Sequence, residues 1–162
     1  MNITLTVNGE ARQVGAPEAT SLLEVLRNHL GLMGTRYGCG LEQCGCCMVL
    51  VDGQPTYACT RELGTVAGRK VTTIEGLGTQ AAPHPLQQAF LDEQAGQCGY
   101  CLSGIIVSAK ALLDRNPKPT RAEIAKALDG NICRCGTHQR ILRAVERAAA
   151  ALRAKGQAGR PT

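Results

Sequence analysis

The residues best suited to chemistry in this 162-residue chain are its nine cysteines, an odd number that fits a disulfide framework poorly. A chain of this length with 44% apolar residues can bury a core without cross-links. Reduced cysteine thiolates are good ligands for zinc and for iron–sulfur clusters. The cysteine content therefore predicts metal binding in a compartment where thiols stay reduced.

A first group of cysteines lies in and after a glycine-rich loop, at Cys39, Cys44, Cys47 and Cys59. The spacing of three cysteines as C-x4-C-x2-C, with a fourth further along, is that of plant-type ferredoxins, where four thiolates hold a 2Fe-2S cluster. Glycines such as Gly45 let the backbone turn tightly, so that main-chain amides can point at the cluster sulfurs. These four cysteines are the predicted ligands of a 2Fe-2S cluster.

A second group consists of two short pairs, Cys98-x2-Cys101 and Cys133-x-Cys135. Each pair precedes a predicted helix, so two helix amino ends with their free amides would converge on one anionic site. Four thiolates there can hold zinc or iron, and the spacing alone leaves both open. Rieske ligation is not indicated, because no histidine of this chain lies in a Cys-x-His pattern. The ferredoxin-type loop in the same chain favours iron.

The first half of the chain contains the strands that must position the first group. Alternating or mostly apolar runs predict five strands, at 3–7, 10–14, 48–51, 55–60 and 70–74. Asn8-Gly9 is a two-residue hairpin turn, and a capping box from Ser21 to Glu24 opens one helix. One helix on a small mixed sheet predicts a β-grasp domain over residues 1–76.

The second half has the period of helices, beginning after residue 78. Four helices are expected: from Pro85 to Ala95, along the apolar stripe 105–113, from Thr120 to Gly130, and from a cap at Thr137 through Leu152. Short loops between them favour a four-helix bundle over residues 77–154. The fold class is therefore α+β, and residues 155–162 are expected to form a flexible tail.

The net charge of +5 is the sum of −1 in the first half of the chain and +6 in the second. Residues 1–76 have six Lys/Arg and seven Asp/Glu, whereas residues 77–162 have twelve and six. Nucleic acid is not indicated as a partner, because interleaved aromatics and a binding motif are missing. The sequence shows neither a signal-peptide pattern nor a membrane-spanning apolar run, so we expect a cytoplasmic location. No P-loop, Ser-His-Asp or paired-carboxylate pattern predicts a catalytic residue.

Three cysteine-bearing segments, at residues 37–49, 97–101 and 130–137, resemble the iron–sulfur subunit of the xanthine oxidase family of molybdenum hydroxylases. The resemblance covers about residues 2–150 and includes all eight ligand positions in order. It implies a β-grasp ferredoxin domain followed by a four-helix domain with a second 2Fe-2S cluster, held by Cys98, Cys101, Cys133 and Cys135. The Leu-Ser-Gly after Cys101 looks most like separate-subunit bacterial enzymes acting on nitrogen heteroaromatics such as isoquinoline or nicotinate.

The resemblance also implies a function and partners. The holoenzyme would hydroxylate an N-heteroaromatic compound or oxidise an aldehyde at a molybdenum–pterin centre in a large partner subunit, with water as the oxygen source. Electrons would pass through the second cluster and then the first to a flavin subunit, a cytochrome or another acceptor. Gln97 would hydrogen-bond the pterin, and Cys135 would lie closest to it. The alternatives are a free ferredoxin-like shuttle and a zinc-stabilised interaction module.

The chain departs from the family pattern at Cys46, where alanine is usual. One interpretation is a small apolar side chain buried beside the first cluster. The other is a reactive thiol that exchanges with Cys47 as a ligand or makes the site sensitive to oxidation.

Overall fold

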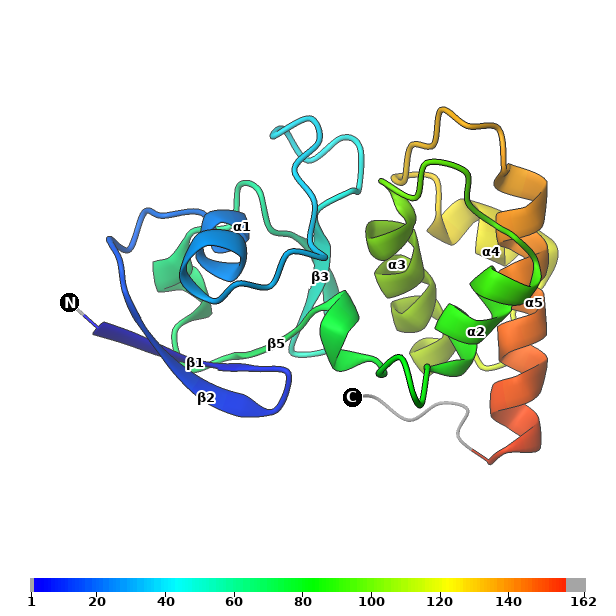
Figure 1. The fold of residues 1–162 in the computed structure, drawn as a ribbon, viewed down its shortest axis with the longest axis horizontal. Helices are drawn as coiled ribbons and strands as arrows, with labels where there is room; N and C mark the ends of the chain where they lie inside the picture. The colour runs from blue at the N-terminus through cyan, green and yellow to red at the C-terminus, as the bar shows by residue number, and fades with distance from the viewer. Residues whose placement is uncertain (1, 157–162) are drawn as a thin grey trace.

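A computed structural model describes residues 2–156, with a β-sheet at one end of the molecule and a group of helices at the other (Figure 1). The strands are β1 (Asn2–Val7), β2 (Glu10–Gly15), β3 (Met48–Val51), β4 (Gln54–Tyr57) and β5 (Lys70–Thr72). Their order in the sheet is β2-β1-β5-β3-β4, with β1 parallel to β5 and the other pairs antiparallel. This mixed sheet confirms the predicted α+β class. The last two strands end earlier than predicted.

The helix predicted from Ser21 is present but is wound in two ways. It begins as α1 (Leu22–Glu24), where the Ser21 hydroxyl accepts a hydrogen bond from the Glu24 N–H at 3.2 Å. It continues as the π-helical segment η1 (Val25–His29), which the apolar pattern did not predict. Short 3-10 turns follow at η2 (Leu63–Val66) and η3 (Ile74–Gly76).

Strand β3 is buried on both faces, which explains its unbroken apolar sequence. Val49 and Val51 belong to the core between the sheet and α1. Met48 and Leu50 pack on the other side against Val107 and neighbouring residues of a helix from the second half of the chain. The two halves are therefore joined by a shared apolar contact along β3.

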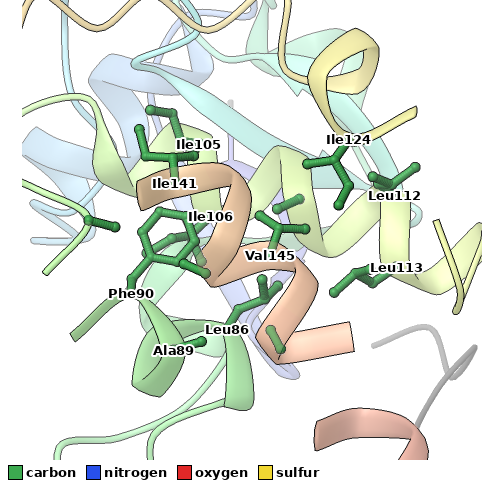
Figure 2. Close-up of a cluster of buried hydrophobic side chains, with 14 of the residues drawn as sticks. Leu86, Ala89, Phe90, Ile105, Ile106, Leu112, Leu113, Ile124, Ile141 and Val145 are labelled. Carbon is green, nitrogen blue, oxygen red and sulfur yellow. The ribbon is translucent and has the colours of Figure 1, made fainter. Parts of the chain in front are cut away.

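The second half forms α2 (Pro85–Asp92), α3 (Leu102–Arg115), α4 (Arg121–Ala127) and α5 (His138–Ala154). Figure 2 shows their common core, in which Phe90 of α2, Ile106 of α3 and Val145 of α5 lie close together. The four predicted helices are present, and α4 ends three residues before Gly130. No helix within residues 2–156 is both long and apolar enough to cross a membrane. Most of the predicted tail, residues 157–162, lies outside the described residues.

The amino end of α2 has a capping box that the sequence did not reveal. The His84 ring nitrogen Nδ1 accepts a hydrogen bond from the Leu86 N–H at 3.1 Å, and the Gln87 side chain accepts one from the His84 N–H at 2.9 Å. Burial, together with the nearby cations Lys110 and Lys155, lowers the pKa of His84 to about 4. The ring is therefore neutral at pH 7 and free to accept.

This cap makes stability dependent on pH. An unfolded histidine has a pKa of about 6.5, so between pH 6.5 and 4 the unfolded chain binds a proton that folded His84 does not. The free energy of unfolding should therefore fall by about 1 kcal/mol between pH 7 and pH 5 on account of this half-buried ring. Denaturant unfolding of His84→Asn, which keeps an acceptor but does not titrate, should show a smaller pH slope. The exposed His29→Asn is the control, and an equal slope in His84→Asn and the native chain would contradict the prediction.

Candidate metal centres

The three cysteine-bearing segments gather at one edge of the molecule, although they are far apart in sequence. Figure 1 shows the loop at 38–47 in cyan facing the loops at 97–101 in green and 131–137 in gold. The Ile132 N–H donates a hydrogen bond to the Cys44 carbonyl at 2.9 Å, and the Asn131 side chain donates one to the Gly45 carbonyl at 3.3 Å. The first loop is thus fastened directly to the segment that contains Cys133.

Main-chain amides surround one half of the first site. The N–H groups of Leu41 and Gln43 donate to the Cys39 sulfur at 3.3 and 3.2 Å, and the Cys39 N–H donates to the Cys44 sulfur at 3.3 Å. The first two bonds lower the pKa of Cys39 to about 7. Donors of this kind stabilise a thiolate and any further negative charge placed on it.

The other half of the first site is more buried. The Cys47 thiol lies within hydrogen-bonding reach of the Cys59 sulfur, and burial raises the pKa of Cys47 to about 12. The two residues meet because the chain returns beside β3 after β4, where the Ala58 N–H donates to the Cys47 carbonyl at 3.2 Å. The structure therefore places the four cysteines predicted for this site in two pairs, Cys39 with Cys44 and Cys47 with Cys59.

The second site is also built from two pairs. The Cys135 and Cys98 sulfurs are 3.5 Å apart, and the Cys101 thiol lies within hydrogen-bonding reach of the Cys133 sulfur. The Tyr100 N–H lowers the pKa of Cys98, whereas burial raises that of Cys101 to about 12. Cys101 immediately precedes α3.

The start of α5 differs from the prediction. The Thr137 side chain makes no capping hydrogen bond to α5, and its hydroxyl lies 3.7 Å from the Cys133 sulfur instead. Cys101 directly precedes α3, and Thr137, directly before α5, lies beside Cys133, so both helices begin next to the second site, as predicted. The Thr137 side chain therefore contacts the second site and does not cap α5.

The pairing of thiols fits 2Fe-2S clusters better than single zinc ions. A structural zinc ion takes four ligands around one point, whereas a 2Fe-2S cluster takes two thiolates on each of two irons. Over residues 2–156 no group of three or more His, Cys, Asp or Glu side chains surrounds a single ion position. Two sulfur pairs at each site are the donor set that a 2Fe-2S cluster requires.

Comparisons with known proteins agree with this donor set. A family model described as 2Fe-2S iron-sulfur cluster binding domain matches residues 5–70, and one described as 2Fe-2S binding domain matches residues 73–146. One of the subunits of nicotinate dehydrogenase from Pseudomonas putida is 57% identical over 147 residues, which cover 91% of this chain and 94% of that protein. The chain belongs to the iron–sulfur small subunits of the molybdenum hydroxylases. It is the electron-transfer component of such an oxidoreductase and has two 2Fe-2S binding domains.

Other relatives of this small subunit support the same assignment. The alpha subunit of isoquinoline 1-oxidoreductase from Brevundimonas diminuta is 52% identical over 148 residues, covering 91% of this chain and 97% of the relative. Quinoline 2-oxidoreductase from Pseudomonas putida 86 has a chain that superimposes with a TM-score of 0.91 at 34% identity, with 97% of this chain and 98% of that chain covered. The aldehyde oxidoreductase from Desulfovibrio desulfuricans gives a TM-score of 0.92 at 43% identity. That match covers 96% of this chain but 17% of the longer one.

Gln97 lies at a cleft beside the second site of the small subunit. Its exposed side chain lines a cavity of about 620 Å³ together with Leu91 of α2 and Arg140 of α5. The Arg140 guanidinium donates to the Gln94 carbonyl at 3.3 Å, which ties α5 to the segment leading to Gln97. The half-exposed Cys135 belongs to the outer sulfur pair of the second site.

A tyrosine bridge between the two sites escaped the sequence analysis. Tyr100 lies between Cys98 and Cys101 in the sequence. Its hydroxyl donates a hydrogen bond at 2.5 Å to the main-chain carbonyl of Tyr37, the residue two positions before Cys39. The Arg36 guanidinium lies 5.4 Å from the centre of the Tyr100 ring, within cation–π range. The only signal in the sequence was the position of Tyr100 inside a cysteine pair.

Removing this hydroxyl should weaken the contact between the two halves. Tyr100→Phe is expected to lower the free energy of unfolding by about 0.5–1 kcal/mol, the usual net contribution of one hydrogen bond. Tyr37→Phe is the matched control, because Tyr37 takes part in the bridge through its main-chain carbonyl. Chemical unfolding of both variants would test this, and an equal loss in the two would show that the bridge contributes nothing.

Proposed function

We propose that this small subunit passes electrons from a molybdenum–pterin centre in a large partner subunit, through the second site and then the first, to an external acceptor. Supporting this order, Gln97 and Gly99, the two neighbours of Cys98 in the sequence, line an open cleft. The observation that carries the proposal is the Ile132 to Cys44 main-chain hydrogen bond, which joins the two ligand segments directly. Electron tunnelling weakens steeply with distance, so adjacent sites are the arrangement that a relay needs.

Each part of the chain has a defined task in this relay. The eight paired cysteines hold the two clusters, each of which takes up and releases one electron when bound. The N–H groups of Leu41 and Gln43 stabilise the charge that an added electron places on the Cys39 sulfur. Burial of Cys47 and Cys101 keeps water from one side of each site.

The cleft beside the second site is the proposed contact with the pterin. The Gln97 carboxamide can both donate and accept hydrogen bonds, which suits the mixed donors and acceptors of a pterin ring edge. Cys135 belongs to the outer sulfur pair of that site and would be the ligand nearest the ring. In this proposal the chain itself binds no substrate.

The surface around both sites is the proposed interface with the large subunit. Large apolar side chains are strongly exposed there, and four of them lie in the cysteine-bearing segments: Tyr37, Leu41, Tyr100 and Ile132. Apolar exposure concentrated around the sites is typical of a surface that a partner covers. For the holoenzyme we propose hydroxylation of an N-heteroaromatic compound, from the names of the nicotinate and isoquinoline relatives, ahead of aldehyde oxidation. The acceptor would be a flavin or cytochrome subunit or another carrier.

Purification of the native complex through a tag on this chain tests the proposal. We expect a large molybdenum subunit to copurify, and about four iron and four labile sulfide for each copy of this chain. Adding nicotinate or isoquinoline anaerobically should then reduce both clusters, seen as two electron paramagnetic resonance (EPR) signals. A colourless chain with stoichiometric zinc would contradict it. A red-brown chain that purifies alone would favour the free shuttle.

A further inference from the structure

Eight cysteines are accounted for by the two sites, and the ninth, Cys46, lies between them. Although Cys46 belongs to the first loop, its side chain is 7% exposed and packs into the core of the helical half. The next residue, Cys47, belongs to the core of the sheet half. The two thiols therefore point to opposite sides of the chain, and Cys46 cannot replace Cys47 as a ligand without a rearrangement of the backbone.

The Cys46 sulfur lies beside a predicted ligand of the first site. A β-carbon placed on Gly38 would be 2.5 Å from the Cys44 sulfur and 3.3 Å from the Cys46 sulfur, so both sulfurs pack over the same glycine. The Cys46 and Cys44 sulfurs are therefore neighbours in the first loop. Cys46 also shares the buried cluster of the helical half with Cys101, and Cys133 packs against the same cluster.

This position determines which way a hydrogen bond would run. A thiol buried in apolar surroundings keeps its proton, whereas a cysteine that binds iron is a thiolate and can only accept. Cys46 is therefore the donor and Cys44 the acceptor. A donor aimed at a ligand sulfur stabilises the more negative, reduced cluster and so raises its reduction potential.

We propose that Cys46 is a positioning residue whose S–H group donates to the Cys44 sulfur and raises the reduction potential of the first cluster relative to the second. The proposal rests on the proposed function, because it assumes a 2Fe-2S cluster in each site. One electron enters the first cluster, and Cys46 keeps its proton throughout. A higher potential at the first site favours electron transfer in the direction from the second site to the first.

The test is a redox titration of the native complex, followed by EPR, with the variants Cys46→Ala and Cys46→Ser. Cys46→Ala removes the donor and should lower the midpoint potential of the first cluster while leaving that of the second unchanged. Cys46→Ser keeps a hydroxyl donor at the same place and should hold the first potential near the native value. Pulsed EPR in D₂O should show one exchangeable proton fewer at the first cluster in Cys46→Ala than in the native complex.

Three results would overturn the proposal. The first is an unchanged midpoint potential of the first cluster in Cys46→Ala. The second is that the alanine and serine variants shift the potentials of both clusters by the same amount. The third is the same number of exchangeable protons at the first cluster in the native complex and in Cys46→Ala. The second result would indicate a packing role alone. If the alanine variant does not fold, Cys46→Val, which fills the same space without a donor, takes its place and should lower the first potential in the same way. Absence of both 2Fe-2S signals from the native complex would instead contradict the proposed function itself.

Discussion

A Gly104→Ala variant is expected to be less stable than the native subunit, although alanine is normally the better residue inside a helix. Gly104 lies in the first turn of α3, where a β-carbon would be 1.9 Å from the Gly45 carbonyl oxygen and 3.1 Å from the Cys46 Cα. Both are backbone atoms of the first loop, so the overlap cannot be relieved by rotating a side chain. Overpacking of this kind costs about 1–3 kcal/mol or more, against a gain of about 1 kcal/mol from helix preference.

We therefore expect Gly104→Ala to lower the free energy of unfolding by about 2 kcal/mol. The variant should also lose iron from the first site faster than from the second, because the displaced segment belongs to the first loop. Ser103→Ala is the matched control, since it is the neighbouring residue and its hydroxyl has no hydrogen-bond partner within the described part of the chain. Urea unfolding and iron release would measure both effects. A stabilised Gly104→Ala variant would mean that the two halves do not touch at this point.

The elements of the fold were predictable because each follows a simple period. Alternating apolar residues and the Asn8-Gly9 turn identified the first hairpin, and the 3.6-residue period identified the helices. The errors include the ends of β4 and β5 and the π-helical segment η1. The others lie at helix ends, where side-chain geometry decides. Thr137 stands at the position of a helix cap, yet its hydroxyl lies near the Cys133 sulfur. His84 caps α2 through its ring, which a pattern of serine and threonine caps does not include.

Contacts between the two halves were not predictable, because the residues that make them have ordinary local roles. In the sequence Gly104 looks like an ordinary glycine within a helix. Only the structure shows that the Gly45 carbonyl packs directly against it. Strand β3 is apolar at four successive positions, which indicates burial on both faces but does not identify α3 as the second partner. Tyr100 donates to a main-chain carbonyl, which any residue at position 37 would offer.

The two cysteine groups are predicted from the particular spacings that cluster ligation demands, whereas the placement of the two sites side by side could not be predicted. Nothing in the sequence relates the loop at 38–47 to the segment at 131–137. The Ile132 to Cys44 hydrogen bond settles that relation in the structure. Cys46, two residues after Cys44, has its side chain in the helical core. A relay of two adjacent sites is thus a property of the packing and not of either motif.

The largest effects are expected from removing one sulfur of each site in turn. Cys59→Ala should abolish the EPR signal of the first cluster and leave that of the second, and Cys98→Ala should do the reverse. Each variant should retain about two iron per chain instead of four. Cys59 is chosen because it pairs with Cys47, on the sheet side of the chain, away from the spare thiol of Cys46. Cys98 pairs with Cys135 at the exposed edge of the second site, so its loss should disturb folding least.

The two variants should also differ in where electrons stop when the complex is given its substrate. Without the first cluster, the second should still be reduced, and transfer to the acceptor should cease. Without the second, the first should stay oxidised, because its only route from the pterin passes through the missing cluster. Cys46→Ala is the control, since it removes a cysteine but should keep both signals and all the iron. Loss of both signals from either single variant, in protein that circular dichroism shows to be folded, would mean that the eight cysteines are divided between the clusters in another way.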